Sequence, residues 1–304
     1  MDHISIVIVH YNTDKDTREC LDSLEELEAK NFKYHIIVVD NASKEPLKLT
    51  HKQLENNVEL LRSESNLGFT GGNNIGIRHA INTHNSDYIL LLNSDTVVTP
   101  DFLEKLYKYA ETEPEIGLVN PKIYFAKGYE YHKNSYAKAE LGSVLWYVGG
   151  SIDWLHLLSF HRGIDEVDRG HFDSIQETDF ATGCCVLIKR EVFEHIGPLN
   201  ERLFLYSEDV DVSLRAQRAG FKTMLCPSAV IWHKNAGSSQ GAGSNISVYY
   251  QTRNRLYIGL KYGTWRAKWS ALRLIGDKLL NGTKIERKAV QDLLTRNLGK
   301  QPII

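Results

Sequence analysis

The fold of this chain is decided by the stretch Asp87-Tyr88-Ile89-Leu90-Leu91-Leu92-Asn93-Ser94-Asp95-Thr96. Its apolar run is too short to cross a membrane and predicts a fully buried strand over 88–92. The strand is followed by the polar triplet 93–95. Ligands of open parallel sheets bind outside the carboxyl ends of the strands, which places Asp95 where a divalent cation could be held against a phosphate. The alternative is a loop that only leads into a helix, with Thr99 as its N-cap and Pro100 as its first residue.

Strands and helices alternate along much of the chain. In the first 120 residues the expected strands are 4–9, 35–39, 58–62 and 88–92, and the expected helices are 17–29, 74–83 and 100–111. Residues 124–178 have weak periodicity and are expected to form an insertion that carries substrate-recognition loops. Regular elements return with strands at 183–189, 222–225 and 229–233, helices at 191–196 and up to Ala219, and a mainly helical region from 247. The alternation with short connections predicts an α/β fold with a mostly parallel central sheet flanked by helices.

Length, composition and charge narrow the class of protein. A chain of 304 residues can form one large domain or two smaller ones, and 42% apolar residues are sufficient for a core. The net charge of −2 gives no indication of a nucleic-acid partner. Between Arg253 and Lys300, however, 12 Lys/Arg stand against 3 Asp/Glu, a net charge of +9, which leaves 24 − 35 = −11 for the remainder. This asymmetry predicts an anionic partner for the C-terminal region.

The basic C-terminal region also interleaves aromatic and cationic residues, which is typical of amphipathic helices at anionic lipid interfaces. The alternative is a helical bundle that packs on the catalytic domain or on a second subunit.

The cysteines and the N-terminal residues indicate in which cellular compartment the protein is expected. Cys20, Cys184, Cys185 and Cys226 show no metal-ligand spacing, and Cys184 and Cys185 lie in an apolar run as expected of small core residues. The first residues enter a strand without a signal-peptide pattern, and no segment is long enough to span a bilayer. We therefore expect a reduced, cytoplasmic protein, with the inner face of the cell membrane as a possible place of contact.

Two polar segments adjoin predicted strands. The glycine-rich turn 66–74 opens a helix, and its free N–H groups could bind an anion. Its glycines do not fit the dinucleotide pattern, and a tight turn that needs positive φ is the alternative. Asp40 follows the second strand, where it could accept a hydrogen bond from a pyrimidine N3–H or a ribose hydroxyl, or could cap a turn.

Acidic residues and a histidine mark the second half of the chain. Glu208, Asp209 and Asp211 precede a helix. Closely spaced carboxylates raise one another's pKa so that one can act as a general base, whereas acids in a first helical turn also favour the helix dipole. Both can hold, with Glu208 and Asp211 structural and Asp209 chemical. His233 ends a strand before the small residues 237–241, and is either a metal ligand or a structural histidine.

Together these motifs resemble glycosyltransferase family 2, inverting enzymes of GT-A fold, and look most like its bacterial rhamnosyltransferase-like branch. The matching segments are, in order, 5–12, 38–43, 66–74, 92–95, 182–183 with 189–190, 206–211 and 231–233. The resemblance extends over about residues 4–260. It implies a GT-A catalytic domain at 1–246, with a nucleotide-binding half at 1–120 and an acceptor-binding half at 121–246, followed by a basic amphipathic helical region at 247–304.

The resemblance also implies roles for individual residues. The nucleotide sugar would be bound by His10, Tyr11, Asn12, Asp40, Asn41, Gly68, Phe69, Asn73, Asn93, Ser94 and Asp95. Asp95 and His233 would hold Mg²⁺ or Mn²⁺, and the site has one charge fewer than the family's usual Asp-x-Asp because Asn93 takes the first place. Asp209 would be the catalytic base, and Asp179, Thr182, Gly183 and Glu208 would lie near the donor sugar or the acceptor.

The implied reaction is an inverting transfer from a nucleotide-diphosphate sugar, with dTDP-rhamnose as the expected donor. The expected acceptor is a hydroxyl of a cell-envelope or lipid-linked glycan, and a homodimer is possible. Alternatives are a UDP-sugar-dependent transferase of the same fold and a module that binds nucleotide sugars without turnover. A nucleotidyltransferase is disfavoured, because residues 10–13 replace the glycine-rich, Arg/Lys-bearing loop that would follow its first strand.

Overall fold

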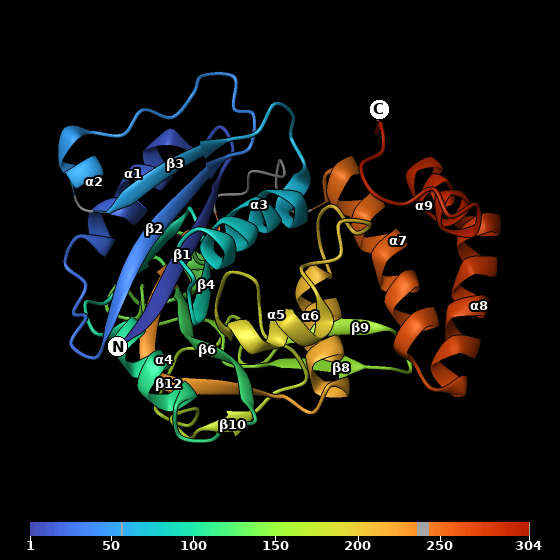
Figure 1. Cartoon of the computed structure of the whole chain (residues 1–304). Coiled ribbons are helices and arrows are strands. Elements are labelled where there is room, and N and C mark those ends of the chain that lie inside the picture. The colour runs from blue at the N-terminus through green and yellow to red at the C-terminus, as the bar shows by residue number, and fades with distance from the viewer. Residues whose placement is uncertain (56, 236–242, 304) are drawn as a thin grey trace.

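One mixed sheet forms the centre of the computed structural model, which describes residues 1–55, 57–235 and 243–303 (Figure 1). Its strands are β1 (Asp2–His10), β2 (Phe32–Asp40), β3 (Val58–Arg62), β4 (Tyr88–Asn93), β5 (Thr96–Val98), β6 (Ile116–Phe125), β7 (Leu145–Tyr147), β10 (Gln176–Glu177), β11 (Cys185–Lys189) and β12 (Lys222–His233). The order is β10-β12-β6-β11-β4-β1-β2-β3, with β5 beside β12 and β7 beside β6. A small second sheet pairs β8 (Gly150–Asp153) with β9 (Leu158–His161).

Helices surround this sheet and extend beyond it on one side. They are α1 (Asp14–Leu24), α2 (His51–Glu55), α3 (Gly68–Asn82), α4 (Phe102–Ala110), the 3₁₀ turn η1 (Lys133–Ser135), α5 (Arg190–Ile196), α6 (Glu208–Arg218), α7 (Asn245–Tyr262), α8 (Trp265–Asn281) and α9 (Lys284–Leu294). The small-residue run 237–241 lies outside the described residues.

The sheet is mixed: among the described residues, four of its strand pairs run parallel and five run antiparallel, so the mostly parallel order that the sequence predicted holds only within two blocks. β4, β1, β2 and β3 form a parallel block, and β6 pairs parallel with β12. Only β11 separates the two blocks, antiparallel to both β4 and β6. The register places His10 beside Asp40 and Val9 beside Asn93, so β1, β2 and β4 end at one edge of the sheet.

Alternate residues of β1 face two separate cores. Ile4, Ile6 and Ile8 pack with residues of α1 and α4, whereas Val7 packs with residues of α3, α5 and α6 on the opposite face. A shift of register by one residue would exchange the two faces. The apolar pattern therefore also fixes which side chains reach the carboxyl edge.

The glycine-rich segment 66–74 differs from the prediction, because most of it belongs to α3 and not to a turn that precedes the helix. Gly72 of this segment and Gly76, which follows it, allow α3 to pack against β1. A Cβ at Gly72 would come within 2.8 Å of Val9 Cγ1, and a Cβ at Gly76 would overlap Val7. Gly72 and Gly76 therefore let α3 lie close to β1. Among the glycines of 66–74, only Gly68 has a positive φ, +72°, as a tight turn would require.

Other predicted boundaries were also wrong. The first helix spans Asp14–Leu24 and not 17–29, and α4 begins at Phe102 with Asp101 as its N-cap, so Thr99 does not cap it. The two strands expected at 222–225 and 229–233 form the single strand β12, because an irregularity between Cys226 and Val230 bends it without ending it.

The C-terminal helices α7, α8 and α9 stand beside the part of the molecule that contains the central sheet, and are coloured orange to red in Figure 1. α7 is the inner helix of this group: Tyr249, Tyr250 and Asn254 are buried. Arg253 is fully buried too, so it does not belong to a basic surface as the charge count suggested. Within the described residues no helix is long and apolar enough to cross a membrane.

Candidate active site

A cleft of about 940 Å³ opens at the carboxyl edge of the sheet. Twelve of the predicted site residues line it: Tyr11, Asn41, Gly68, Phe69, Asn93, Ser94, Asp95, Thr182, Gly183, Glu208, Asp209 and His233. They come from the end of β4, from the loops after β1, β2 and β4, from the segment before β11, from the N-terminal ends of α3 and α6, and from the end of β12. The topology thus brings residues that are more than 200 positions apart in sequence into one site.

Asp95 and His233 meet at this edge because β5 pairs antiparallel with β12, with Thr96 opposite His233. His233 Nε2 lies 3.0 Å from Asp95 Oδ1, and the His233 side chain is buried. Within the described parts of the chain, His233 Nδ1 has no hydrogen-bond partner. A carboxylate oxygen and an imidazole nitrogen therefore converge on the cleft, and both are ligand types that suit Mn²⁺, while the carboxylate also suits Mg²⁺.

The three acids of α6 have different environments. Asp211 is fully buried and accepts hydrogen bonds from Tyr262 Oη at 2.6 Å and Arg215 Nε at 2.8 Å. Burial opposes ionisation of Asp211, but these partners outweigh it and lower the pKa. Asp211 is thereby committed to tying α6 to α7.

Glu208 and Asp209 have raised pKa values instead. Glu208 is 6% exposed, and no hydrogen bond to its Oε2 is found among the described residues. Burial raises its pKa well above the ordinary value, and the neighbouring charge of Asp209 adds to the rise. Burial likewise raises the pKa of Asp209, whose Oδ1 accepts from Val210 N at 2.8 Å and whose Oδ2 accepts from Gly183 N at 3.4 Å. Asp209 is thus a cleft carboxylate suited to taking up a proton.

The segment that leads into α6 is held in an unusual backbone conformation. Phe204, Tyr206 and Ser207 have φ values of +65°, +68° and +65°, a region that costs energy for residues other than glycine. Gly68 adjoins this segment, and a Cβ there would overlap the carbonyl oxygen of Phe204. The N-terminal end of α3 and the entrance to α6 therefore form one closely packed wall of the cleft.

Two buried residues of α7, which the sequence analysis missed, support the strained segment. Asn254 Nδ2 donates to the carbonyl oxygens of Leu203, Leu205 and Tyr206 at 3.0, 2.8 and 2.8 Å. Arg253 donates from Nη2 to the carbonyl oxygen of Leu203 at 3.0 Å. Tyr249, Arg253 and Leu256 are spaced at helical intervals, which places Arg253 on an apolar face of α7. This spacing could have predicted that Arg253 is buried.

Five predicted residues do not line the cleft: His10, Asn12, Asp40, Asn73 and Asp179. Asp40 is fully buried, and its two oxygens accept from the backbone amides of Ser43 and Leu47 at 2.8 and 3.1 Å. It also pairs with Arg62. In this conformation the Asp40 carboxylate organises the loop after β2 and has no free oxygen for a base.

The other four are likewise engaged elsewhere. Burial lowers the pKa of His10, and its Nδ1 lies 2.8 Å from Thr17 Oγ1. Asn73 Nδ2 donates to Phe69 O, and Asn12 Oδ1 accepts from Lys44 N, both at 2.9 Å. Asp179 is exposed, with its Oδ2 accepting from Ile152 N at 2.8 Å.

The sequence of the chain also matches a known protein family. The model of the family described as "Glycosyl transferase family 2" matches residues 5–197, more than half of the chain. The chain belongs to glycosyltransferase family 2. It is a transferase enzyme of the GT-A type that acts on nucleotide sugars.

Curated relatives of this glycosyltransferase come from archaea and bacteria. A low-salt glycan biosynthesis hexosyltransferase, Agl10, of Haloferax volcanii is 26% identical over 84% of this chain and 75% of its own length. An N-acetylglucosaminyl-diphospho-decaprenol L-rhamnosyltransferase of Mycobacterium tuberculosis is 24% identical over 77% of this chain and 78% of its own length.

Solved structures share the fold at low identity. GalNAc-T7 with UDP, GalNAc and Mn²⁺ superposes with a TM-score of 0.66 and 16% identity over 99% of this chain and 56% of the longer protein. The mannosyltransferase PcManGT of Pyrobaculum calidifontis, in complex with GDP-Man and Mn²⁺, has a TM-score of 0.54 and 14% identity over 97% of this chain and 79% of its own. Both likenesses confirm the GT-A fold expected from the sequence.

The insertion predicted at 124–178 adds an apolar end to the cleft of this glycosyltransferase. Trp146, Trp154, Leu157 and Leu158 line it, and Arg255 of α7 faces the same space. This apolar end is formed by residues between positions 146 and 158 and by α7. It offers aromatic and apolar surface of the kind on which sugar rings and lipid chains pack.

Proposed function

We propose that this glycosyltransferase moves a sugar from a nucleotide-diphosphate donor to an acceptor hydroxyl by a metal-assisted single displacement that inverts the anomeric carbon. One observation carries the proposal: the Asp95–His233 pair and the Asp209 carboxylate line the same cleft. In this proposal residues 1–120 bind the nucleotide and residues 121–246 bind the acceptor.

Asp95 and His233 are the proposed ligands of Mg²⁺ or Mn²⁺. The 3.0 Å separation of Asp95 Oδ1 and His233 Nε2 brings two ligand atoms to one side of the cleft, which fits a shared cation. When bound, such a cation neutralises the charge that builds on the departing diphosphate. Two solved structures of the same fold were obtained with Mn²⁺ and a nucleotide or nucleotide sugar, which supports this assignment.

Asp209 is the proposed general base. Its carboxylate takes the proton of the acceptor hydroxyl, and the oxygen attacks the anomeric carbon while the bond from that carbon to the diphosphate oxygen breaks. Because the attack comes from the face opposite the diphosphate, no nucleophile of the enzyme is required. The raised pKa of Asp209 makes it a stronger base than an exposed aspartate.

The proposed donor is dTDP-rhamnose and the proposed acceptor is a lipid-linked or cell-envelope glycan. The mycobacterial relative is named as a rhamnosyltransferase of an N-acetylglucosaminyl-diphospho-decaprenol acceptor, and it aligns over most of both chains. A UDP-sugar is the alternative donor, since a structure of TarS with UDP-GlcNAc is also similar. A homodimer remains a prediction.

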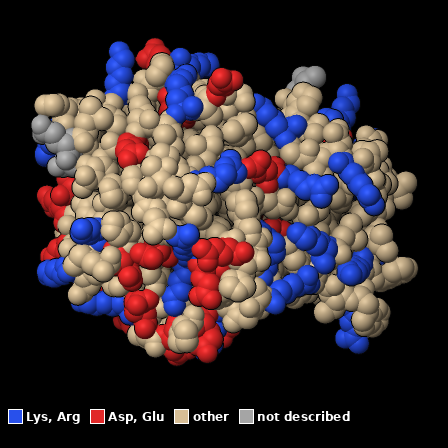
Figure 2. Space-filling model, viewed as in Figure 1, with Lys and Arg blue, Asp and Glu red and all other residues tan. Residues whose placement is uncertain are grey.

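The outer face of α8 is the proposed contact with an anionic membrane. Trp265 and Trp269 are 74% and 62% exposed, and Leu272 and Leu280 are exposed beside them. Lys and Arg side chains gather over this side of the molecule (Figure 2). Exposed tryptophans bordered by cations match an anionic lipid interface, where a lipid-linked acceptor would also reside.

The proposed function is tested by a donor screen followed by product analysis. Thermal shifts with dTDP-rhamnose, UDP-galactose, UDP-N-acetylglucosamine and GDP-mannose are measured with and without Mn²⁺. A shift with one donor that needs Mn²⁺ and disappears in Asp95→Ala identifies the sugar. NMR of the product with a polyprenyl-diphosphate N-acetylglucosamine acceptor then shows an inverted glycoside. Donor binding without turnover on any glycan acceptor would favour the non-catalytic module instead.

A further inference from the structure

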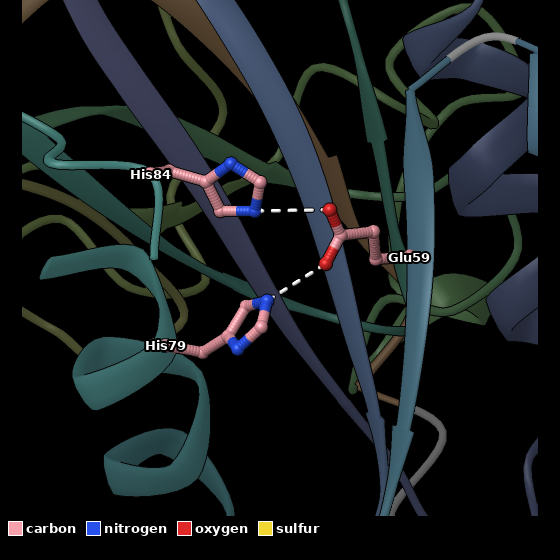
Figure 3. Close-up of side chains that lie close together, drawn as sticks. All are labelled: Glu59, His79 and His84. Carbon is pink, nitrogen blue, oxygen red and sulfur yellow. Dashed lines mark hydrogen bonds and ion pairs between the residues drawn. The ribbon is translucent and has the colours of Figure 1, made fainter. Parts of the chain in front are cut away.

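A second cluster of metal-ligating side chains lies outside the cleft, at the amino end of β3 (Figure 3). Glu59 is the second residue of β3, His79 lies in the last turn of α3, and His84 follows that helix. The donor cleft lies at the opposite, carboxyl edge of the sheet. The proposed mechanism uses none of these three residues.

The three side chains point toward one another and use both carboxylate oxygens (Figure 3). His79 Nε2 lies 2.7 Å from Glu59 Oε2, and His84 Nε2 lies 3.0 Å from Glu59 Oε1. One ligand atom from each residue lies within 4.8 Å of the other two. Ligand atoms around a tetrahedral Zn²⁺ are about 3.4 Å apart, so small side-chain rotations would place all three on one ion.

His84 has the most buried side chain of the three. Its side chain is 11% exposed, and its Nε2 forms an ion pair with Glu59 without the alignment of a full hydrogen bond. His35 stacks on its ring at 4.3 Å between centroids and covers this side of the cluster. A buried imidazole nitrogen beside a carboxylate oxygen that a second imidazole also faces has the position of a metal ligand.

His79 is held in the matching orientation by its other ring nitrogen. His79 Nδ1 lies 3.3 Å from Thr83 Oγ1. When Nδ1 carries the proton and donates it to Thr83, the Nε2 lone pair is directed at the Glu59 side. Histidines that bind metals commonly donate their second N–H to such a partner.

We propose that Glu59, His79 and His84 form a binding site for a divalent transition-metal ion, with Zn²⁺ as the best-fitting occupant. Two imidazoles and one carboxylate favour Zn²⁺ over Mg²⁺, which prefers an all-oxygen shell. The ion would join β3 to the C-terminal end of α3, the helix whose first residues border the donor cleft. The fourth ligand would be water, reached through the partly exposed side of the site.

Zn²⁺ and Co²⁺ binding to the full chain test this site, with Asp95→Ala as the background that removes the proposed donor-site metal. Equilibrium dialysis is expected to give one Zn²⁺ per chain in this background. Co²⁺ is expected to give the intense visible absorption of a tetrahedral site, displaced by Zn²⁺. Adding His79→Ala or His84→Ala should weaken Zn²⁺ binding at least tenfold. Binding of no Zn²⁺ in the Asp95→Ala background would overturn the proposal.

Matched variants separate ligation from general effects. His171→Ala removes another histidine that pairs with a glutamate, Glu166 at 3.4 Å on the surface, and should leave Zn²⁺ binding unchanged. Glu59→Gln keeps the size of the ligand but removes its charge, and should also weaken binding at least tenfold while circular dichroism shows a folded chain. Unchanged Zn²⁺ affinity in His84→Ala would assign the ion to another place and would overturn the proposal.

Discussion

The side-chain amide of Asn254 donates a hydrogen bond to the carbonyl oxygen of Tyr206 at 2.8 Å and so joins α7 to the segment that leads into α6. The same nitrogen reaches two further carbonyl groups of this segment. Helix α7 therefore supports one wall of the cleft, because the positive φ values at Phe204, Tyr206 and Ser207 need an external support.

Replacing Asn254 by Ala is expected to damage both stability and catalysis. Stability should fall because each buried carbonyl that loses its donor costs about 1–3 kcal/mol. Catalysis should fall because the strained segment positions Asp209 in the cleft. We expect a loss of about 2–4 kcal/mol in the free energy of unfolding, measured by urea denaturation. The kcat should fall by about tenfold or more. Asn281→Ala, at the exposed end of α8, is the control. Equal kcat values for the two variants would contradict the supporting role.

Asp209→Asn tests the general base. The amide keeps the shape of the side chain but cannot take a proton, so kcat should fall by about 100- to 10,000-fold. The KM for the donor should change little, because the base acts on the acceptor. Asp179→Asn removes an exposed acid outside the cleft and should be nearly silent. A fall of less than about threefold in Asp209→Asn would reject this assignment.

The pH dependence of turnover follows from the same carboxylate. Burial raises the pKa of Asp209, so the protonated, inactive form persists to a higher pH than for an exposed aspartate. The rate should therefore decrease as the pH falls through this raised pKa, and should reach a plateau above it. The profile of kcat/KM against pH measures this limb, which should be absent from the residual activity of Asp209→Asn.

The buried Glu208 should make the protein less stable as the pH rises, whereas an ion-paired acid would make it more stable. Its pKa is raised in the folded state, so the folded protein binds more protons than the unfolded chain at pH values above the ordinary pKa. Stability then falls as the pH rises through this window. Glu208→Gln should raise the Tm at pH 8 and flatten its dependence on pH. For a chain of 304 residues, each kcal/mol gained would raise the Tm by about 1.5 °C. An unchanged slope of Tm against pH in Glu208→Gln would contradict the burial argument.

The alternating strands and helices of the first half of the chain were predictable from their apolar patterns. The apolar run before Asp95 was visible in the sequence, and the rule that ligands bind outside strand ends placed Asp95 at the edge of the sheet. The acids around Asp209 were visible too, but they begin a helix, and only the family resemblance linked them to Asp95. The glycines of α3 were misread, because helix packing against Val7 and Val9 and a tight turn both require glycine. Sequence alone does not show which neighbour excludes a Cβ.

Interactions made by backbone atoms were beyond the sequence. Asp40 carries the residue type expected for nucleotide recognition, yet the amides of Ser43 and Leu47 occupy its oxygens. Nothing in the sequence distinguishes Asn254 from the other asparagines. It has its role because the fold brings the backbone of 203–206 next to it, about fifty residues away in sequence. Both arrangements depend on the path of the main chain, which no side-chain pattern encodes.

The exposed face of α8 gives the last prediction. Trp265 and Trp269 project from a helix whose opposite side, at Ala267, Ala271 and Ile275, is buried. Their removal therefore leaves the packing of α8 intact, and Trp265→Ala with Trp269→Ala should keep the Tm. The double variant should lose about tenfold or more of its binding to vesicles that contain 30% phosphatidylglycerol, measured by co-sedimentation. Leu54→Ala, an exposed apolar residue on α2, is the matched control. Binding that is insensitive to the tryptophans but abolished by high salt would assign the contact to the basic residues alone.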